Sequence, residues 1–105
     1  MEREEVEFKE TLRLNLFTNK VAAGLAEKAA REIVAFMNTQ GGKIIVGVAD
    51  DGQLLGIDAD IASFATATKP GTEDDFRLYI DHAVRDRLGM EYLGYVHVRF
   101  ETLAT

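Results

Sequence analysis

The most constraining stretch of this sequence runs from Glu32 to Asp60 and reads EIVAFMNTQGGKIIVGVADDGQLLGIDAD. It predicts the end of an amphipathic helix, a glycine turn, a buried strand, an acidic turn and a short strand. Asn38, Gly41 and Gly42 are expected to stop the helix and reverse the chain, because these residue types adopt positive φ readily. The apolar run from Ile44 to Val48 is short and mostly β-branched, which favours a strand covered on both faces.

The acidic turn Asp50-Asp51-Gly52 follows this strand. Aspartate tolerates the left-handed conformation and glycine adopts it freely, so the turn predicts a hairpin whose second strand is Leu54 to Ile57. Gly47 lies inside the first strand and has no Cβ. We therefore expect a close neighbour at Gly47, and a packed helix is the expected occupant.

The residues before this centre predict one strand and one long helix. Alternating residues predict a half-exposed strand from Glu5 to Lys9. The same alternation continues from Leu12 to Leu16, either as one long bent strand or as a strand followed by an extended connector. Apolar residues at three- and four-residue steps predict a helix from Val21 to Met37 with a core-facing stripe.

The residues after the centre predict a short helix or turn at 58–67, a second long helix and a last strand. Thr72 is expected to cap the N-terminus of the long helix and Gly89 to end it. Alternation from Tyr95 to Glu101 predicts the last strand. The element order predicts an α+β fold, in which two long helices pack on a mixed sheet of about four to six strands.

Length and composition restrict the class of protein. The 105 residues allow one domain, residues 1–105, with a single core. The absence of cysteine excludes disulfides and thiolate zinc sites. No apolar run approaches the roughly 20 residues of a membrane helix, and the acidic N-terminus is unlike a secretory signal, so we expect a cytoplasmic protein without a membrane partner. Because a strand is predicted just before the end of the chain, we also expect an N-terminal fragment of a longer protein.

The formal net charge of −6 argues against a broad cationic surface for nucleic acid, because phosphate binding relies on many Lys and Arg contacts. A local basic patch remains open. Lys9, Arg13 and Lys43 lie near the central motifs and are the candidates for contacts with a nucleic-acid backbone if folding brings them together. If folding scatters them, they belong to an ordinary polar surface.

Acidic residues gather in the N-terminal segment and in the Asp-Asp-Gly turn. If the first strand lies beside the 43–48 strand, two or three of these carboxylates could converge and hold Mg²⁺ or Mn²⁺ through oxygen ligands. Such a site suits phosphodiester cleavage, in which the metal polarises the phosphate and prepares the water. The alternative is a solvated strand edge beside an ordinary hairpin turn. The acidic residues concerned are Glu2, Glu4, Glu5, Glu7, Asp50 and Asp51.

Two segments, VEFKETLRLNL at 6–16 and IVAFMNTQGGKIIVGVADDGQLLGID at 33–58, together resemble the Schlafen-type Alba-like (AlbA_2) domain family. The shared pattern is an "EFK" strand, a helix ending in "A-F-x-N-T-x-G-G", an apolar strand ending in "GV" and an acidic "DDG" turn. The resemblance implies an α+β domain that binds nucleic acid, specifically DNA, in bacterial regulators that carry further modules downstream. By analogy with the family, we expect a homodimer.

The same resemblance implies candidate catalytic residues, because animal Schlafen proteins with related domains include RNA-cleaving nucleases. Glu7 matches the glutamate of "EFK", Glu2 lies near the upstream glutamate, and Asp50 matches the aspartate of the turn. These three would hold Mg²⁺ or Mn²⁺. Three hypotheses follow: a domain that binds DNA or RNA, a metal-dependent nuclease, and a self-association or regulatory domain without nucleic-acid binding.

Overall fold

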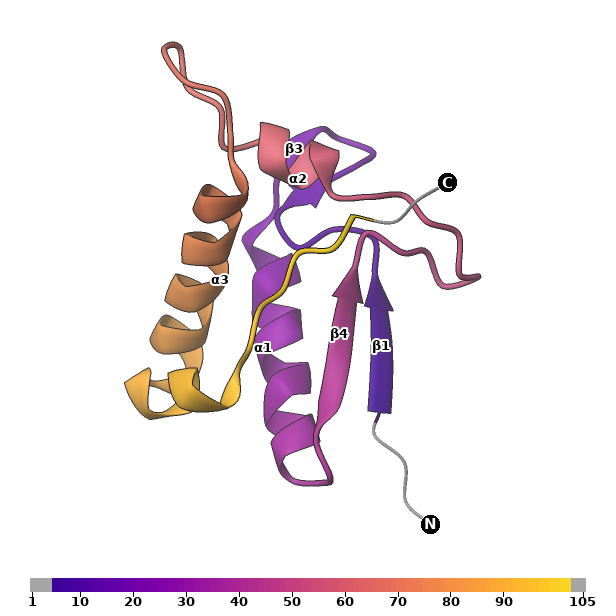
Figure 1. Cartoon of the computed structure of the whole chain (residues 1–105), viewed down its shortest axis with the longest axis vertical. Helices are drawn as coiled ribbons and strands as arrows, with labels where there is room; N and C mark the ends of the chain where they lie inside the picture. Colours follow the sequence, from indigo (N-terminus) through magenta and orange to yellow (C-terminus); the bar gives the residue numbers. More distant parts are fainter. Residues whose placement is uncertain (1–4, 103–105) are drawn as a thin grey trace.

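The computed structural model describes residues 5–102, which form strands and helices of very different lengths (Figure 1). Two long helices, α1 and α3, lie beside a short pair of strands, β1 and β4. In chain order the elements are β1 (Glu5–Lys9), β2 (Leu14–Asn15), β3 (Lys20–Val21), α1 (Ala23–Met37), β4 (Gly42–Val46), α2 (Asp58–Ala62), α3 (Glu73–Leu88) and the 3₁₀ helix η1 (Met90–Tyr95).

Strands β1 and β4 pair in parallel, with Glu5 opposite Gly42 and Lys9 opposite Val46. Helix α1 covers one face of this pair. A Cβ on Gly42 would lie 2.6 Å from the Phe36 ring of α1, so only glycine allows the helix to approach this closely. The Lys9 side chain of β1 reaches α1. Because side chains alternate along a strand, the charged residues of β1 lie on the face toward α1.

The opposite face of the strand pair carries Val6, which is 51% exposed, and Ile45, which is 39% exposed. The described elements therefore leave part of this face open. The prediction that the 44–48 strand is covered on both faces is wrong, because Ile44 and Val46 pack into the core whereas Ile45 does not.

The predicted sheet of four to six strands is also wrong. Residues 5–102 contain four strands in two separate two-stranded sheets, β1 with β4 and β2 with β3, together with four helical segments. The expected hairpin partner at 54–57 is reduced to one isolated bridge between Val48 and Leu54. The pairing does not continue beyond this bridge, and Gly56, two residues later, has a positive φ of 78°.

The last predicted strand is replaced by η1 and an extended segment that follows α3. Arg77 of α3 donates a hydrogen bond to the carbonyl oxygen of Val98 at 2.9 Å. The ring of Phe100 lies 6.1 Å from that of Phe76, centroid to centroid. These contacts with α3 hold residues 96–100 where sequence alternation predicted pairing with a sheet.

The core lies between α1, α3 and the strand pair, and centres on Leu12, Ala29 and Phe76. Phe76 is 1% exposed. Burial of a phenylalanine side chain stabilises a fold by roughly 1.5–3 kcal/mol, so Phe76, together with the buried Val84, contributes strongly to the packing of α3. The partly buried residues that pack around the centre are Ile44, Val46, Ile57, Ile61, Phe64, Tyr79, Ile80 and Phe100.

The turn residues act in two different ways. Gly41 and Gly52 have φ values of 91° and 89°, as predicted. Asn38 caps α1 with φ at −85°, and Gly42 is required for the close approach of Phe36, so neither uses the positive φ predicted for it. At Gly47, φ is 91° and a Cβ would lie 2.8 Å from the backbone of Gly56. The close neighbour of Gly47 is thus a backbone segment, and the predicted helix is wrong.

The ends of α3 confirm the sequence prediction. The Thr72 hydroxyl accepts a hydrogen bond from the backbone N–H of Asp75, and the Asp75 carboxylate accepts one from the backbone N–H of Thr72. This reciprocal pair is a capping box. Gly89 ends the helix with φ at 101°.

Candidate nucleic-acid interface

One end of the molecule is organised by the buried carboxylate of Asp60, in the middle of α2. Asp60 is 0% exposed. It accepts hydrogen bonds from the backbone N–H groups of Leu12 at 2.7 Å, Arg13 at 3.2 Å and Leu14 at 2.9 Å. Because a buried charge requires such partners, these bonds fix the segment between β1 and β2 against α2.

The Arg13 side chain makes a second connection between the same segments. Its guanidinium donates to the carbonyl oxygen of Ser63 at 2.9 Å and to the Ser63 hydroxyl at 3.0 Å. It also lies over the Phe64 ring, 4.0 Å from the centroid. Arg13 therefore holds the residues after α2 in place through Nη1, while its buried Nε has no hydrogen-bond partner among the described residues.

The hairpin β2–β3 projects from this anchored base. At its tip the Asn15 side-chain oxygen accepts hydrogen bonds from the backbone N–H groups of Phe17 at 2.9 Å and Thr18 at 3.1 Å. Asn19 closes the turn with φ at 57°, and its N–H donates to the Asn15 carbonyl oxygen at 2.8 Å. An asparagine side chain that bonds to the next backbone groups stabilises a turn of this kind.

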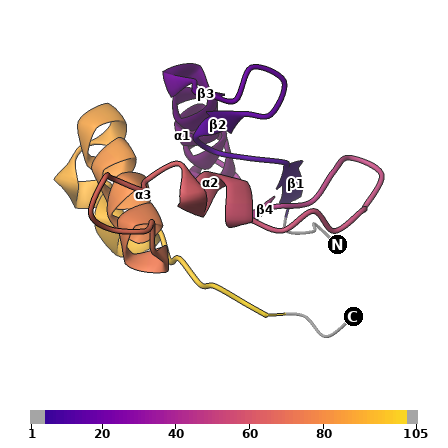
Figure 2. The same cartoon turned by 90° about the horizontal axis from the view of Figure 1, so that it is seen from above.

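Two segments at this end lack acidic residues, although the whole chain has a net charge of −6 and α2, between them, carries Asp58 and the buried Asp60. Residues 11–26 contain no Asp or Glu and include Arg13 and Lys20. Residues 61–72 contain none either and include Lys69. Figures 1 and 2 show the β2–β3 hairpin and the loop after α2 at the same end of the molecule, with α2 between them. We name these two segments, 11–26 and 61–72, the acid-free end.

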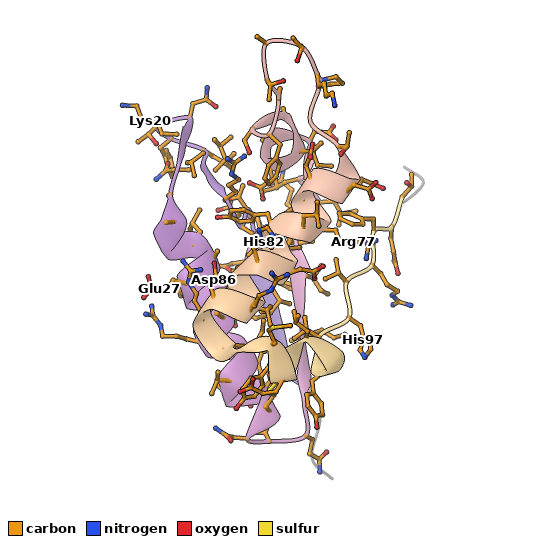
Figure 3. All side chains as sticks on the ribbon, turned by 90° about the vertical axis from the view of Figure 1, so that its left-hand side faces the viewer. Lys20, Glu27, Arg77, His82, Asp86 and His97 are labelled. Carbon is orange, nitrogen blue, oxygen red and sulfur yellow. The ribbon has the colours of Figure 1, made fainter. Side chains whose placement is uncertain are left out.

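The cation Lys20 is the outermost charge of the hairpin. It is exposed, and Figure 3 shows its side chain pointing away from the body of the molecule. Lys69 is exposed on the loop between α2 and α3. These two lysines can meet a phosphate backbone without first breaking the packing of the core.

Of the three cations predicted to bind nucleic acid, Lys9 lies in an ion pair between β1 and α1. Its Nζ lies 2.5 Å from Glu32 Oε1 and 3.9 Å from Glu7 Oε1. The Lys9 side chain is 13% exposed. In this structure the lysine of the "EFK" motif joins a strand to a helix, and its role toward nucleic acid stays a prediction.

Folding does not bring Lys9, Arg13 and Lys43 together as one patch. Lys43 is exposed on β4 opposite Val6, whereas Lys9 is opposite Val46. Side chains alternate between the faces of a strand, so Lys9 and Lys43 point to opposite faces of the β1–β4 pair. Arg13 lies beyond the end of β1 and packs on Ser63 and Phe64.

The predicted catalytic carboxylates are separated in the structure. Glu2 lies outside the described residues. Glu7 lies on β1 with its carboxylate turned toward Lys9, and Asp50 is exposed in the turn after β4. Within residues 5–102, no three His, Cys, Asp or Glu side chains are grouped so that they could hold a metal ion. The prediction of a three-carboxylate site therefore stays untested, because one of its members is not described.

Sequence reasoning missed the two residues that define this end, Asp60 and Phe17. The sequence predicts no role for Asp60, because its hydrogen bonds reach 46–48 residues along the chain. The sequence likewise predicts no role for Phe17, and the structure leaves it 100% exposed. The signal that could have located the site is the lack of acids over 11–26 in an acidic chain.

The described fold is a small α+β domain in which a parallel strand pair is joined through a hairpin and a long helix. The chain belongs to the family described as Schlafen, AlbA_2, whose profile matches residues 2–102. This match confirms the resemblance seen in the sequence motifs. Neither the curated proteins nor the solved structures include a match to the chain. Among residues 5–102 no helix is both long and apolar enough to cross a membrane.

Proposed function

We propose that this domain binds nucleic acid, DNA or RNA, through its acid-free end. The observation that carries the proposal is the exposure of Lys20, Lys69 and Phe17 on segments that lack Asp and Glu. Negative side chains would repel phosphates, so their absence from these two segments matters more in an acidic protein than in a basic one, although Asp58 is exposed on α2 between the segments. Membership of the AlbA_2 family supports the same function.

The small number of cations sets the expected strength and salt dependence. Each phosphate neutralised contributes about −0.7 to the slope of log K against log salt for single strands, and about −0.9 for duplex DNA. Two lysines therefore give a slope of about −1.4 to −1.8. Binding should be weak at physiological salt unless contacts with bases add to it.

Fluorescence anisotropy with short labelled DNA and RNA, single- and double-stranded, at low salt and at about 0.15 M salt, tests the proposal. The double variant Lys20→Glu/Lys69→Glu should abolish most binding at low salt. The control Lys28→Glu/Arg85→Glu makes the same change in net charge at exposed positions on α1 and α3. Equal losses in both variants would show that net charge alone matters and would contradict a binding site at the acid-free end.

Incubation of the same labelled strands with Mn²⁺, and sedimentation of the protein, test the other two hypotheses. Cleavage by Glu2, Glu7 and Asp50 predicts that Mn²⁺ shortens the labelled strand, and that Glu7→Gln stops this shortening without lowering stability. A self-associating domain in a longer regulator predicts a dimer by sedimentation that does not respond to nucleic acid. The homodimer expected from the family is measured by the same sedimentation experiment.

A further inference from the structure

We infer that Phe17 is a stacking platform for an unpaired base of single-stranded nucleic acid; this inference rests on the proposed function and specifies its ligand. Phe17 is 100% exposed at the tip of the β2–β3 hairpin. A phenylalanine ring with both faces in water is available to a flat aromatic partner. Nucleobases are such partners, and stacking on an aromatic side chain is tolerant of base identity.

The backbone that carries the ring is held before any ligand arrives. Both Phe17 and Thr18 donate their backbone N–H groups to the Asn15 side chain, at 2.9 Å and 3.1 Å. Below the tip, Leu14 is tied to the buried carboxylate of Asp60 at 2.9 Å. A ligand that stacks on Phe17 therefore does not need to order this turn, which lowers the entropy cost of binding.

The positive charge of the hairpin favours a polyanion as the ligand of Phe17. Lys20 lies three residues away on the same hairpin and points outward, and no acid occurs from 11 to 26 (Figure 3). An exposed apolar tip that met an apolar protein surface would gain nothing from this charge pattern. A strand of nucleic acid uses both features, since its bases stack and its phosphates pair with lysine.

Single strands fit better than a duplex for two reasons. The faces of bases in a duplex are already covered by their neighbours, so one exposed ring can reach them only by unstacking the helix. The acid-free end also presents few cations, whereas duplex affinity depends strongly on phosphate contacts. Base stacking supplies binding free energy that this low number of cations does not.

The absence of tryptophan from the chain permits a direct test. The variant Phe17→Trp places a single tryptophan at the tip, and stacking on a base should quench its fluorescence. The matched control is Tyr95→Trp, because Tyr95 is 75% exposed and lies in η1, at the far end of the molecule from the hairpin (Figure 1). Single-stranded oligonucleotides of thymidine or uridine are the probes, with a duplex of mixed sequence as a third arm.

We expect quenching at position 17, at most slight quenching at position 95, and single-strand binding by Phe17→Ala that is weaker by roughly 5- to 150-fold. Phe17→Tyr should retain binding because it keeps the ring. If the unmodified domain binds no nucleic acid, the proposed function fails as well. If it binds, but Phe17→Ala binds equally and Phe17→Trp is not quenched, only the stacking role is overturned.

A second copy of the chain is the alternative occupant of the tip. If a second copy covers the tip, dilution of the Phe17→Trp variant without nucleic acid should change its tryptophan emission. Sedimentation should then show a dimer, and the Phe17→Ala substitution should dissociate it. Such a result would overturn base stacking, since the ring would already be covered by protein. If the emission does not depend on protein concentration and oligonucleotide quenches it, the result supports base stacking on Phe17.

Discussion

The carboxylate of Asp60 accepts a hydrogen bond from the backbone N–H of Leu12 at 2.7 Å, although the two residues are 48 positions apart. Two further backbone N–H groups donate to the same carboxylate. One side chain thus replaces the ladder partners that an adjacent strand would give this segment. The connection places the β2–β3 hairpin relative to α2, and it explains why a charged residue is fully buried.

Replacement of Asp60 by alanine should therefore destabilise the protein strongly. Three backbone donors would lose their acceptor, and we expect the free energy of unfolding to fall by about 2–4 kcal/mol. Urea denaturation measures this fall. Asp58→Ala is the control, because Asp58 lies exposed on the same short helix and should cost below about 1 kcal/mol. Similar losses in the two variants would contradict the anchoring role of Asp60.

The substitution Arg13→Lys tests whether the planar shape of the guanidinium, as well as its charge, contributes to stability. Arg13 donates twice to Ser63 and lies over Phe64, and a lysine ammonium cannot do both. We expect Arg13→Lys to lower the free energy of unfolding by about 1–2 kcal/mol. Arg99→Lys, at a position 80% exposed, should change it by less than about 0.5 kcal/mol. Equal stability of Arg13→Lys and the unmodified protein would reject this account.

Two glycine-to-alanine variants should have opposite effects on stability. At Gly47 a Cβ would lie 2.8 Å from the backbone of Gly56, and φ is 91°, so Gly47→Ala should cost about 2–4 kcal/mol. At Gly24, in α1, a Cβ would meet no atom within 4 Å, so Gly24→Ala should stabilise by about 0.5–1 kcal/mol. Thermal melting of both variants measures the difference. An unchanged melting temperature for Gly47→Ala would contradict a close contact between Gly47 and Gly56.

Alkaline pH should weaken the fold in part through Tyr79. Desolvation by burial raises the pKa of Tyr79 above its usual value of 10.0, although the nearby Arg13 and Arg87 oppose this. A raised pKa in the folded state means that the unfolded chain releases this proton more easily. The contribution of Tyr79 to stability is therefore constant below pH 10 and declines as the pH rises above 10.

The variant Tyr79→Phe should accordingly lose less stability above that pH than the unmodified protein does. Urea denaturation across the alkaline range measures the change. Tyr95→Phe removes a hydroxyl from a side chain that is 75% exposed, and it should leave the pH dependence as it was. If stability falls equally with rising pH in all three proteins, Tyr79 does not cause the loss of stability at alkaline pH.

The elements that sequence could locate are those set by local rules. The capping box at Thr72 and the stop at Gly89 depend on residues a few positions apart, and both occur as predicted. The pairing of β1 with β4 meets the condition, left open by the sequence, that the first strand lies beside the 43–48 strand. The cap and the stop follow from backbone preferences that a short window of sequence contains.

The elements that sequence misplaced depend on distant partners. Alternation at 95–101 predicted a strand, but Phe100 is held by Phe76 on α3 and the segment takes no place in a ladder. The candidate site shows the same limit. Phe17 is fully exposed at the tip of a hairpin whose base is held by the contacts of Asp60 with Leu12 and Leu14, and no local pattern contains those contacts.

The parallel register of β1 and β4 also constrains how the chain reaches its fold. Each residue of β1 pairs with the residue 37 positions later, as Glu5 with Gly42 (42 − 5 = 37) and Lys9 with Val46 (46 − 9 = 37). During synthesis the backbone of β1 therefore cannot pair with β4 until β4 has left the ribosome. Helix α1 can form in that interval, because its contacts are local and helices form in about a microsecond. The early helix then shortens the path between the strands, so damage to α1 should slow folding more than it speeds unfolding.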